Sequence, residues 1–262
     1  MSRKPAPPAL SELLARYLQN QASAHQEGLA FADLSGEVIP HEVAPAQPID
    51  PRLAWDEALA AVRWLAPDAS VRPGQAPPDW PALVASQESE TALAFCAGNF
   101  PQLVRDLHLL LRADDLTQLH RPVGRPAAVP GLLAWAEQAE RQQQYPQMLL
   151  AVGVLRLARQ FDLAQDLLDR HKAEVPAAWQ RAWANETAAL TWHRGKPDAA
   201  LALWLAQPES VPVLFNRGMA ALFLGRPADA RPALSRAVQQ LPDSDAWHHL
   251  GRLYLALAEM RR

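Results

Sequence analysis

The segment Gly195-Lys196-Pro197-Asp198-Ala199-Ala200 returns thirty residues later as Gly225-Arg226-Pro227-Ala228-Asp229-Ala230. In both copies a glycine lies two residues before a proline, and an alanine lies three residues after that proline with an acidic residue between them. Glycine is common just after the end of a helix, and proline is common at the first position of a helix. Each copy therefore predicts the end of one helix, a tight turn and the start of the next helix.

The same spacing continues outside these two segments. Pro208 and Pro242 are 34 residues apart, and Gly218 and Gly251 are 33 residues apart. A helix–turn–helix unit that recurs at such intervals is typical of helical solenoids, in which each unit packs only against its neighbours. The sequence thus predicts an all-α chain built as a solenoid of helical hairpins.

Residues 211–262 carry the most regular copies of the unit. When Val211 is counted as position 1, the first copy has small or apolar residues at positions 8, 15, 20, 24 and 27 and a proline at position 32. These residues are Gly218, Gly225, Ala230, Leu234, Ala237 and Pro242. The next copy holds a W-x-x-L-G-x-x-Y frame, formed by Trp247, Leu250, Gly251 and Tyr254. On these residues the chain resembles the tetratricopeptide repeat (TPR) family. Residues 145–210 keep the pattern in degenerate form, and Pro232 departs from it, because a proline there is expected to kink the second helix or delay its start.

Composition and the positions of proline and glycine divide the chain into three parts. Ile occurs twice and Thr four times, which disfavours sheet, whereas 24 prolines argue for many short helices. We expect a Pro-rich, partly irregular region with two helices over 1–79, helical hairpins over 80–144, and TPR-like repeats over 145–262. The predicted segments are helices over 10–25 and 51–65, a small hairpin over 31–39, helices over 82–97, 101–111, 131–143, 147–159 and 163–171, and a capping helix over 245–262.

Composition also excludes several classes of protein. The net charge of −3 argues against a general nucleic-acid binder, which needs a basic face. Apolar runs of about eight residues are too short to span a bilayer. Cys96 is the single cysteine, so no internal disulfide can form and a reducing compartment, the cytoplasm, is expected. Neither nucleic acid nor membrane is therefore expected as a partner.

No motif for chemistry is found in the sequence. A phosphate loop, GxGxxG, GxSxG and HExxH are all absent. Adjacent helical residues point about 100° apart, so His248 and His249 are expected as surface histidines and not as a metal site. Cys96 lies in an apolar stretch without a basic neighbour, which favours core packing over a nucleophile. We therefore expect no enzyme, no catalytic residue, no metal and no cofactor.

The resemblance implies where a partner would bind. In TPR proteins the first helix of each hairpin lines a concave groove that holds partner peptides, and here Phe215, Met219 and Phe223 form a stripe suited to such a groove. In an alternative arrangement, the terminal helix or another part of the chain covers this stripe. A clamp for a peptide's terminal carboxylate is not expected, because Asp245 and His249 occupy positions that should be basic. The groove candidates are Asn185, Trp192, His193, Phe215, Asn216, Met219, Phe223, His248, His249 and Arg252.

These features favour a non-enzymatic protein–protein interaction module, a scaffold or adaptor that binds a protein or peptide segment in its concave groove. In a second hypothesis the chain is an accessory or assembly-factor subunit, in which residues 1–79 make the specific contact and the repeats act as a spacer. A third hypothesis is an enzyme that uses Asp, Glu and His side chains of residues 1–79.

Four tryptophans are expected to pack against neighbouring helices, namely Trp179, Trp183, Trp204 and Trp247.

Overall fold

The computed structural model describes residues 130–243 and 246–261, residue 126, and parts of the segment 52–81 (52, 55, 56, 59, 62, 65–70 and 75–81). From residue 130 onward the described residues form eight α-helices and no strand, which confirms the all-α prediction for this part of the chain. The helices are α6 (Pro130–Arg141), α7 (Tyr145–Leu157), α8 (Phe161–His171), α9 (Ala177–His193), α10 (Pro197–Leu205), α11 (Val211–Phe223), α12 (Pro227–Gln240) and α13 (Ala246–Met260). The predictions for 10–25, 31–39, 82–97, 101–111 and Cys96 lie outside the described residues.

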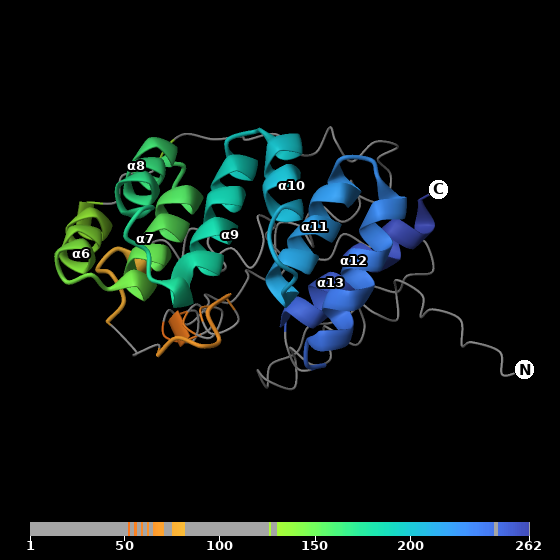
Figure 1. The fold of residues 1–262 in the computed structure, drawn as a ribbon, viewed down its shortest axis with the longest axis horizontal. Coiled ribbons are helices and arrows are strands. Elements are labelled where there is room, and N and C mark those ends of the chain that lie inside the picture. The colour runs from red at the N-terminus through yellow and green to blue at the C-terminus, as the bar shows by residue number, and fades with distance from the viewer. Residues whose placement is uncertain are drawn as a thin grey trace, which may run out of the picture.

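The helices stand side by side in one extended row, with α6 at one end and α12 and α13 at the other (Figure 1). Each helix packs against the next, and α7 also contacts α9, as α11 contacts α13. The connections are only three or five residues long, so consecutive helices run antiparallel. The helices predicted over 131–143, 147–159 and 163–171 are confirmed as α6, α7 and α8, and the helix predicted over 245–262 is confirmed as α13.

Four of the connections share one turn geometry. The residue in the left-handed region is Gln143, Arg159, Gly195 or Gly225, with φ of 51°, 60°, 75° and 70° respectively. At each turn the residue that follows donates its backbone N–H to the carbonyl five positions earlier, as Arg226 does to Ala221 at 2.8 Å. These bonds form the Schellman motif, which satisfies carbonyls at a helix end. The predicted glycine turns are thus confirmed, and two further turns of the same kind use glutamine and arginine.

The two copies of the duplicated segment occupy equivalent places. Helices α10 and α12 begin at Pro197 and Pro227, as predicted, with an acidic residue in the first turn of each. Ala200 and Ala230 are both fully buried. Because an alanine presents little bulk, each of these helices can lie close to the helix that precedes it in the hairpin.

Gly218 of α11 lies where two helices approach closely. A Cβ atom placed there would lie 2.4 Å from Cγ and 3.0 Å from the backbone nitrogen of Leu234 on α12. Leu234 is itself fully buried, as is Trp204 at the equivalent place on α10. Glycine in mid-helix costs about 1 kcal/mol relative to alanine, and the tight contact with α12 offsets that cost.

Of the two effects predicted for Pro232, the delayed start of the helix is wrong. Helix α12 begins at Pro227 and continues without a break through Pro232, so the proline neither ends the helix nor delays its start. Proline removes the backbone bond to the carbonyl four residues earlier, which here belongs to Ala228. Both residues are exposed, so water can hydrate that carbonyl and the helix continues.

Part of the N-terminal region packs against α6. Every described position within 52–65 is helical, which confirms the predicted helix at those positions. Trp55 contacts Trp80 and Trp135 edge-to-face, with ring centroids 5.2 and 5.9 Å apart. Asp79 accepts the backbone N–H of Leu132 at 2.7 Å and so caps the start of α6. The described residues on both sides of position 79 therefore share one core.

Candidate functional site

Six of the ten groove candidates are buried and four are half-buried. The buried side chains are Asn185, Trp192, Phe215, Asn216, Met219 and His248. The half-buried side chains are His193, Phe223, His249 and Arg252. The stripe predicted from α11 is therefore only partly accessible.

Phe215 lies beneath the terminal helix. Its ring centroid is 5.7 Å from that of Trp247 and 5.9 Å from that of Tyr254, both on α13. Phe223 contacts Tyr254 at 5.8 Å and Trp192 at 6.4 Å, again edge-to-face. Aromatic side chains of α11 bury apolar surface by packing against α13, and this packing favours a covered stripe over an open one. Phe215 has this covered arrangement, which was the alternative left open by the sequence.

His248 is not a surface histidine, and that expectation is wrong. Its ring is buried, and Nδ1 donates to the backbone carbonyl of Leu241 at 3.1 Å. Leu241 follows the last turn of α12, so the histidine satisfies a carbonyl at that helix end and fixes α13 against it. Nε2 of the ring lies 3.4 Å from Oδ1 of Asp243.

Asn185 and Asn216 form a buried polar cluster with Trp204. Asn185 Oδ1 accepts the side-chain N–H of Asn216 at 2.8 Å and the indole N–H of Trp204 at 3.0 Å. The two hydrogen bonds join α9 to α11 and to α10, and all three side chains are fully buried. Asn216 Oδ1 is also buried and has no hydrogen-bond partner among the described residues. The two asparagines predicted to line the groove therefore hold neighbouring hairpins together.

A buried ion pair lies one hairpin earlier. Arg156 on α7 donates Nε–H to Oε1 of Glu186 on α9 at 2.9 Å, and the two side chains are 1 % and 0 % exposed. Arg156 Nη1 also lies 3.3 Å from Nε2 of His193. Removing two charges from water is costly, and close pairing in a low-dielectric interior compensates for part of that cost. The pair joins two helices that are adjacent in space but not in sequence.

Sequence reasoning overlooked Arg156 and did not pair it with Glu186. A signal was present, because the two residues are 30 positions apart and the two asparagines are 31 apart, both close to the repeat length. Polar residues at one repeat spacing, on helices with apolar faces, indicate side chains that meet between units. Arg156 pairs with Glu186 and Asn185 pairs with Asn216, so each cluster joins helices of neighbouring hairpins.

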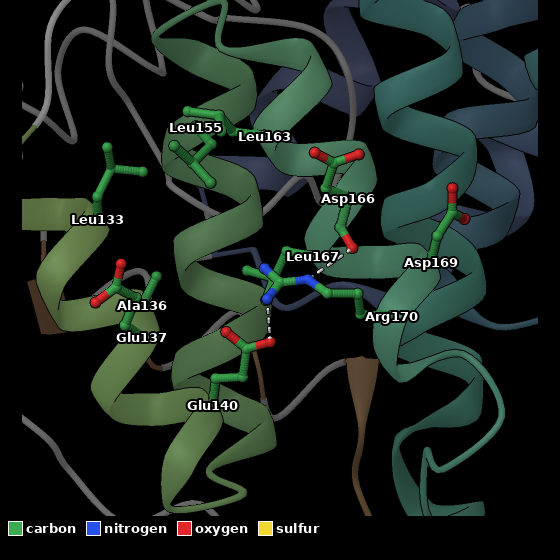
Figure 2. Close-up of a pocket in the computed structure, with 10 residues that line it drawn as sticks. All are labelled: Leu133, Ala136, Glu137, Glu140, Leu155, Leu163, Asp166, Leu167, Asp169 and Arg170. Carbon is green, nitrogen blue, oxygen red and sulfur yellow. Dashed lines mark hydrogen bonds and ion pairs between the residues drawn. The ribbon is translucent and has the colours of Figure 1, made fainter.

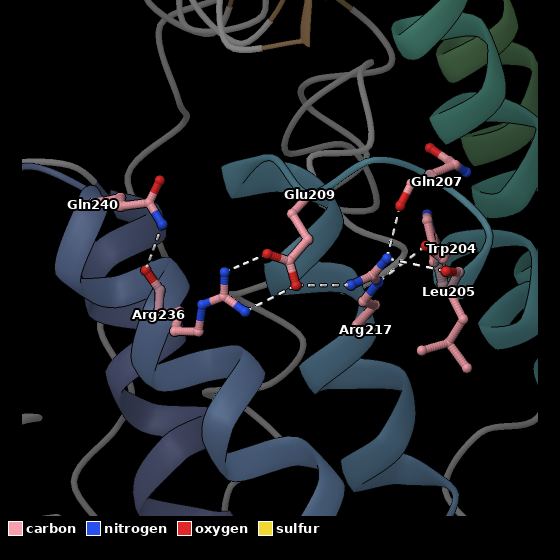
Figure 3. A network of polar contacts seen from close by, with 7 residues as sticks. All are labelled: Trp204, Leu205, Gln207, Glu209, Arg217, Arg236 and Gln240. Atoms are coloured by element: carbon pink, nitrogen blue, oxygen red, sulfur yellow. Dashed lines mark hydrogen bonds and ion pairs between the residues drawn. The ribbon is translucent and has the colours of Figure 1, made fainter.

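A third polar network lies on the connection between α10 and α11 (Figure 3). Arg217 on α11 donates to the backbone carbonyls of Trp204, Leu205 and Gln207, at 3.0, 3.2 and 2.8 Å. Its Nη1 also lies 3.4 Å from Oε1 of Glu209. A single guanidinium thus binds three backbone carbonyls at and just after the end of the short helix α10.

Glu209 joins this network to α12. Arg236 donates Nη1–H to its Oε1 at 2.8 Å and also bonds the second carboxylate oxygen. The hydrogen bond from Arg236 lowers the pKa of Glu209 below its ordinary value of 4.5; partial burial opposes this, and the charges of Arg236 and Arg217 add to it. The carboxylate therefore stays ionised to a lower pH than an ordinary glutamate does.

The lowered pKa of Glu209 predicts an acid-sensitive contribution to stability. The folded protein binds this proton more weakly than the unfolded chain, so the stabilisation is complete above pH 4.5 and is lost as the pH falls further. Glu209→Gln should lower the melting temperature slightly at neutral pH, and this effect should shrink as the pH falls below 4.5. Thermal unfolding of both proteins across this range checks the prediction. A difference that grows on acidification would contradict it.

The described parts of the chain contain neither a cluster of metal-ligating side chains nor a membrane-spanning helix. No three His, Cys, Asp or Glu side chains among the described residues lie close enough to hold a metal ion. None of the helices described there is long and apolar enough to cross a membrane. Comparison of the chain with protein families, curated proteins and solved structures finds no match.

Proposed function

We propose that this chain is a non-enzymatic protein–protein interaction module of the cytoplasm, organised as a TPR-like solenoid of helical hairpins. It holds a segment of a partner protein on the inner side, which is lined by the first helix of each hairpin. The contact lies near the exposed parts of Phe223 and Arg252. The lone cysteine fits a reducing compartment.

One observation carries this proposal: successive hairpins are equivalent in their turns. The left-handed residues Arg159, Gly195 and Gly225 are 36 and 30 positions apart. Each ends its helix with the same pair of backbone hydrogen bonds, for example from Gly195 to Trp192 and from Lys196 to Thr191. A row of equivalent hairpins presents long surfaces for protein recognition, as solenoids do.

The inner surface that remains accessible is smaller than the sequence implied. Phe223 and Leu255 are half-buried apolar side chains, on α11 and α13, and Arg252 adds a cation on α13. Aromatic and arginine side chains dominate the energetics of protein interfaces. This combination suits a partner segment that brings an apolar side chain and a carboxylate.

Partner capture from host cells tests the proposal. We expect full-length protein to recover a defined partner, and Arg252→Glu to reduce its recovery about tenfold by reversing the contact charge. Lys172→Glu makes the same change of charge at an exposed position after α8 and serves as the matched control. Equal recovery by the two variants, with unchanged melting temperatures, would refute the inner site.

Deletion of residues 1–50 tests the spacer hypothesis. This deletion keeps Trp55, which contacts Trp135 on α6, Trp80, which contacts Trp55, and Asp79, which caps α6. Under our proposal the shortened protein retains the partner. Loss of the partner, with circular dichroism and melting temperature unchanged, would favour a contact made by the N-terminal region.

A further inference from the structure

A hollow of about 390 Å³ opens between α6 and α8, at the end of the row opposite to α13 (Figures 1 and 2). Its volume falls within the range of about 300–1,000 Å³ over which protein pockets hold ligands. Leu163 lines this hollow and is 39 % exposed, so its side chain is accessible from outside. The apolar lining consists of Leu133, Ala136, Leu155, Leu163 and Leu167.

The polar lining of this hollow is mainly acidic. It comprises four acids and one base: Glu137, Glu140, Asp166, Asp169 and Arg170. Glu137 has only a long contact to Arg141, 3.9 Å between two exposed side chains, which contributes little. Asp166 and Asp169 are exposed on α8 and make no ion pair with another described residue. Asp169 Oδ1 accepts the side-chain N–H of Gln165 at 3.0 Å, but none of these three carboxylates has a close cationic partner among the described residues.

Arg170 shows how this rim binds a guanidinium. Its side chain reaches from α8 toward α6, where Nη1 lies 2.6 Å from Oε1 of Glu140 (Figure 2). Its Nε–H donates to the backbone carbonyl of Asp166 at 3.3 Å. His171 Nε2 also lies 2.9 Å from the same Glu140 oxygen. Glu140 is thus already occupied, whereas Glu137, Asp166 and Asp169 surround the open part.

We propose that this hollow docks a basic amphipathic segment of a partner protein. One leucine-like or phenylalanine-like side chain enters the apolar hollow beside Leu163, and flanking Arg or Lys residues pair with Glu137, Asp166 and Asp169. The charge of the rim complements this occupant and repels an acidic one. The site lies on α6 and α8, far along the row from Phe223 and Arg252, so it does not rest on the inner site of the proposed function.

The test measures the binding of three fluorescently labelled peptides to the full-length protein. Binding is detected by fluorescence anisotropy at low salt. The first peptide is a short helix with leucine on one face and arginine on the other; the second replaces leucine with serine, and the third replaces arginine with glutamate. We expect binding of the first peptide only. The proposal requires both the apolar face and the basic face, so equal binding of the first and second peptides would overturn it.

Protein variants locate the binding. Glu137→Gln with Asp166→Asn should weaken the first peptide about threefold to fivefold, as two exposed ion pairs allow. Asp229→Asn with Glu259→Gln removes the same charge from exposed positions elsewhere and should leave binding unchanged. Equal weakening by the two double variants would indicate diffuse attraction and overturn the site.

Two further measurements separate this site from the inner one. Leu163→Ser, at a side chain already partly exposed, should abolish binding without lowering the melting temperature. A photoreactive group at the central leucine of the peptide should label α6 or α8. Labelling of α11 or α13 would refute the hollow while leaving the inner site of the proposed function intact.

Discussion

Replacing Arg156 by Met is expected to lower the free energy of unfolding by about 3–5 kcal/mol, and Glu186→Gln should have a similar effect. Each substitution removes one charge of a pair whose side chains are 1 % and 0 % exposed. The remaining charge then lies in the interior without its counter-charge, and this desolvated charge causes the loss. Urea unfolding followed by circular dichroism measures the change.

The double variant and a surface pair provide the controls. Arg156→Met combined with Glu186→Gln should cost about 1–3 kcal/mol less than the sum of the single changes, because no charge is left behind. Arg226→Met breaks the exposed contact between Arg226 and Asp198 and should cost no more than about 1 kcal/mol. Equal losses from Arg156→Met and Arg226→Met would contradict the assignment of a buried pair.

Gly218→Ala is expected to destabilise the protein by about 1–3 kcal/mol, although alanine is the better helix former by about 1 kcal/mol. The new Cβ would lie 2.4 Å from Cγ of Leu234, so α11 and α12 must move apart. Leu234→Ala alone should cost about 2–5 kcal/mol, because it leaves a cavity in a fully buried position. Chemical denaturation of the variants measures both effects.

A double-mutant cycle tests whether the contact itself is responsible. With Leu234→Ala in place, Gly218→Ala should become much less costly, since the side-chain atoms it meets are gone. Gly225→Ala is the matched control: its Cβ would meet nothing within 4 Å, but φ is +70°. Its cost arises from backbone conformation and should be the same with either residue at 234. An additive cycle for Gly218 would contradict the close-contact explanation.

The helices could be predicted because their ends carry local signals. Pro197 and Pro227 begin α10 and α12, and Gly195 and Gly225 supply the left-handed turns before them. The equivalent turns at Gln143 and Arg159 carry no such signal, since these residues enter the left-handed region only at a conformational cost. Their turns are imposed by the packing of α6, α7 and α8, which is not visible in a local pattern.

The candidate site was harder to predict than the fold. Positions taken from the repeat resemblance locate Phe215 and Asn216 correctly on one helix, but they do not show what lies above that helix. Trp247 and Tyr254 cover Phe215, and Asn185 occupies the amide of Asn216. Whether an amphipathic face is open depends on how far neighbouring helices can approach, and that distance is fixed by contacts between distant residues.

The buried polar contacts between hairpins make the units non-interchangeable. Arg156, Trp192 and Leu222 each lie three residues before a left-handed turn residue, and only the first of them can face a carboxylate. If the segment 181–210 were duplicated, the second copy of Glu186 would meet Trp192 in place of Arg156, and a buried carboxylate would face an indole ring. The side chains at each interface therefore fit only one order of the hairpins. Uniform repeat arrays can gain or lose whole units, whereas in this protein such a change would bring mismatched side chains together.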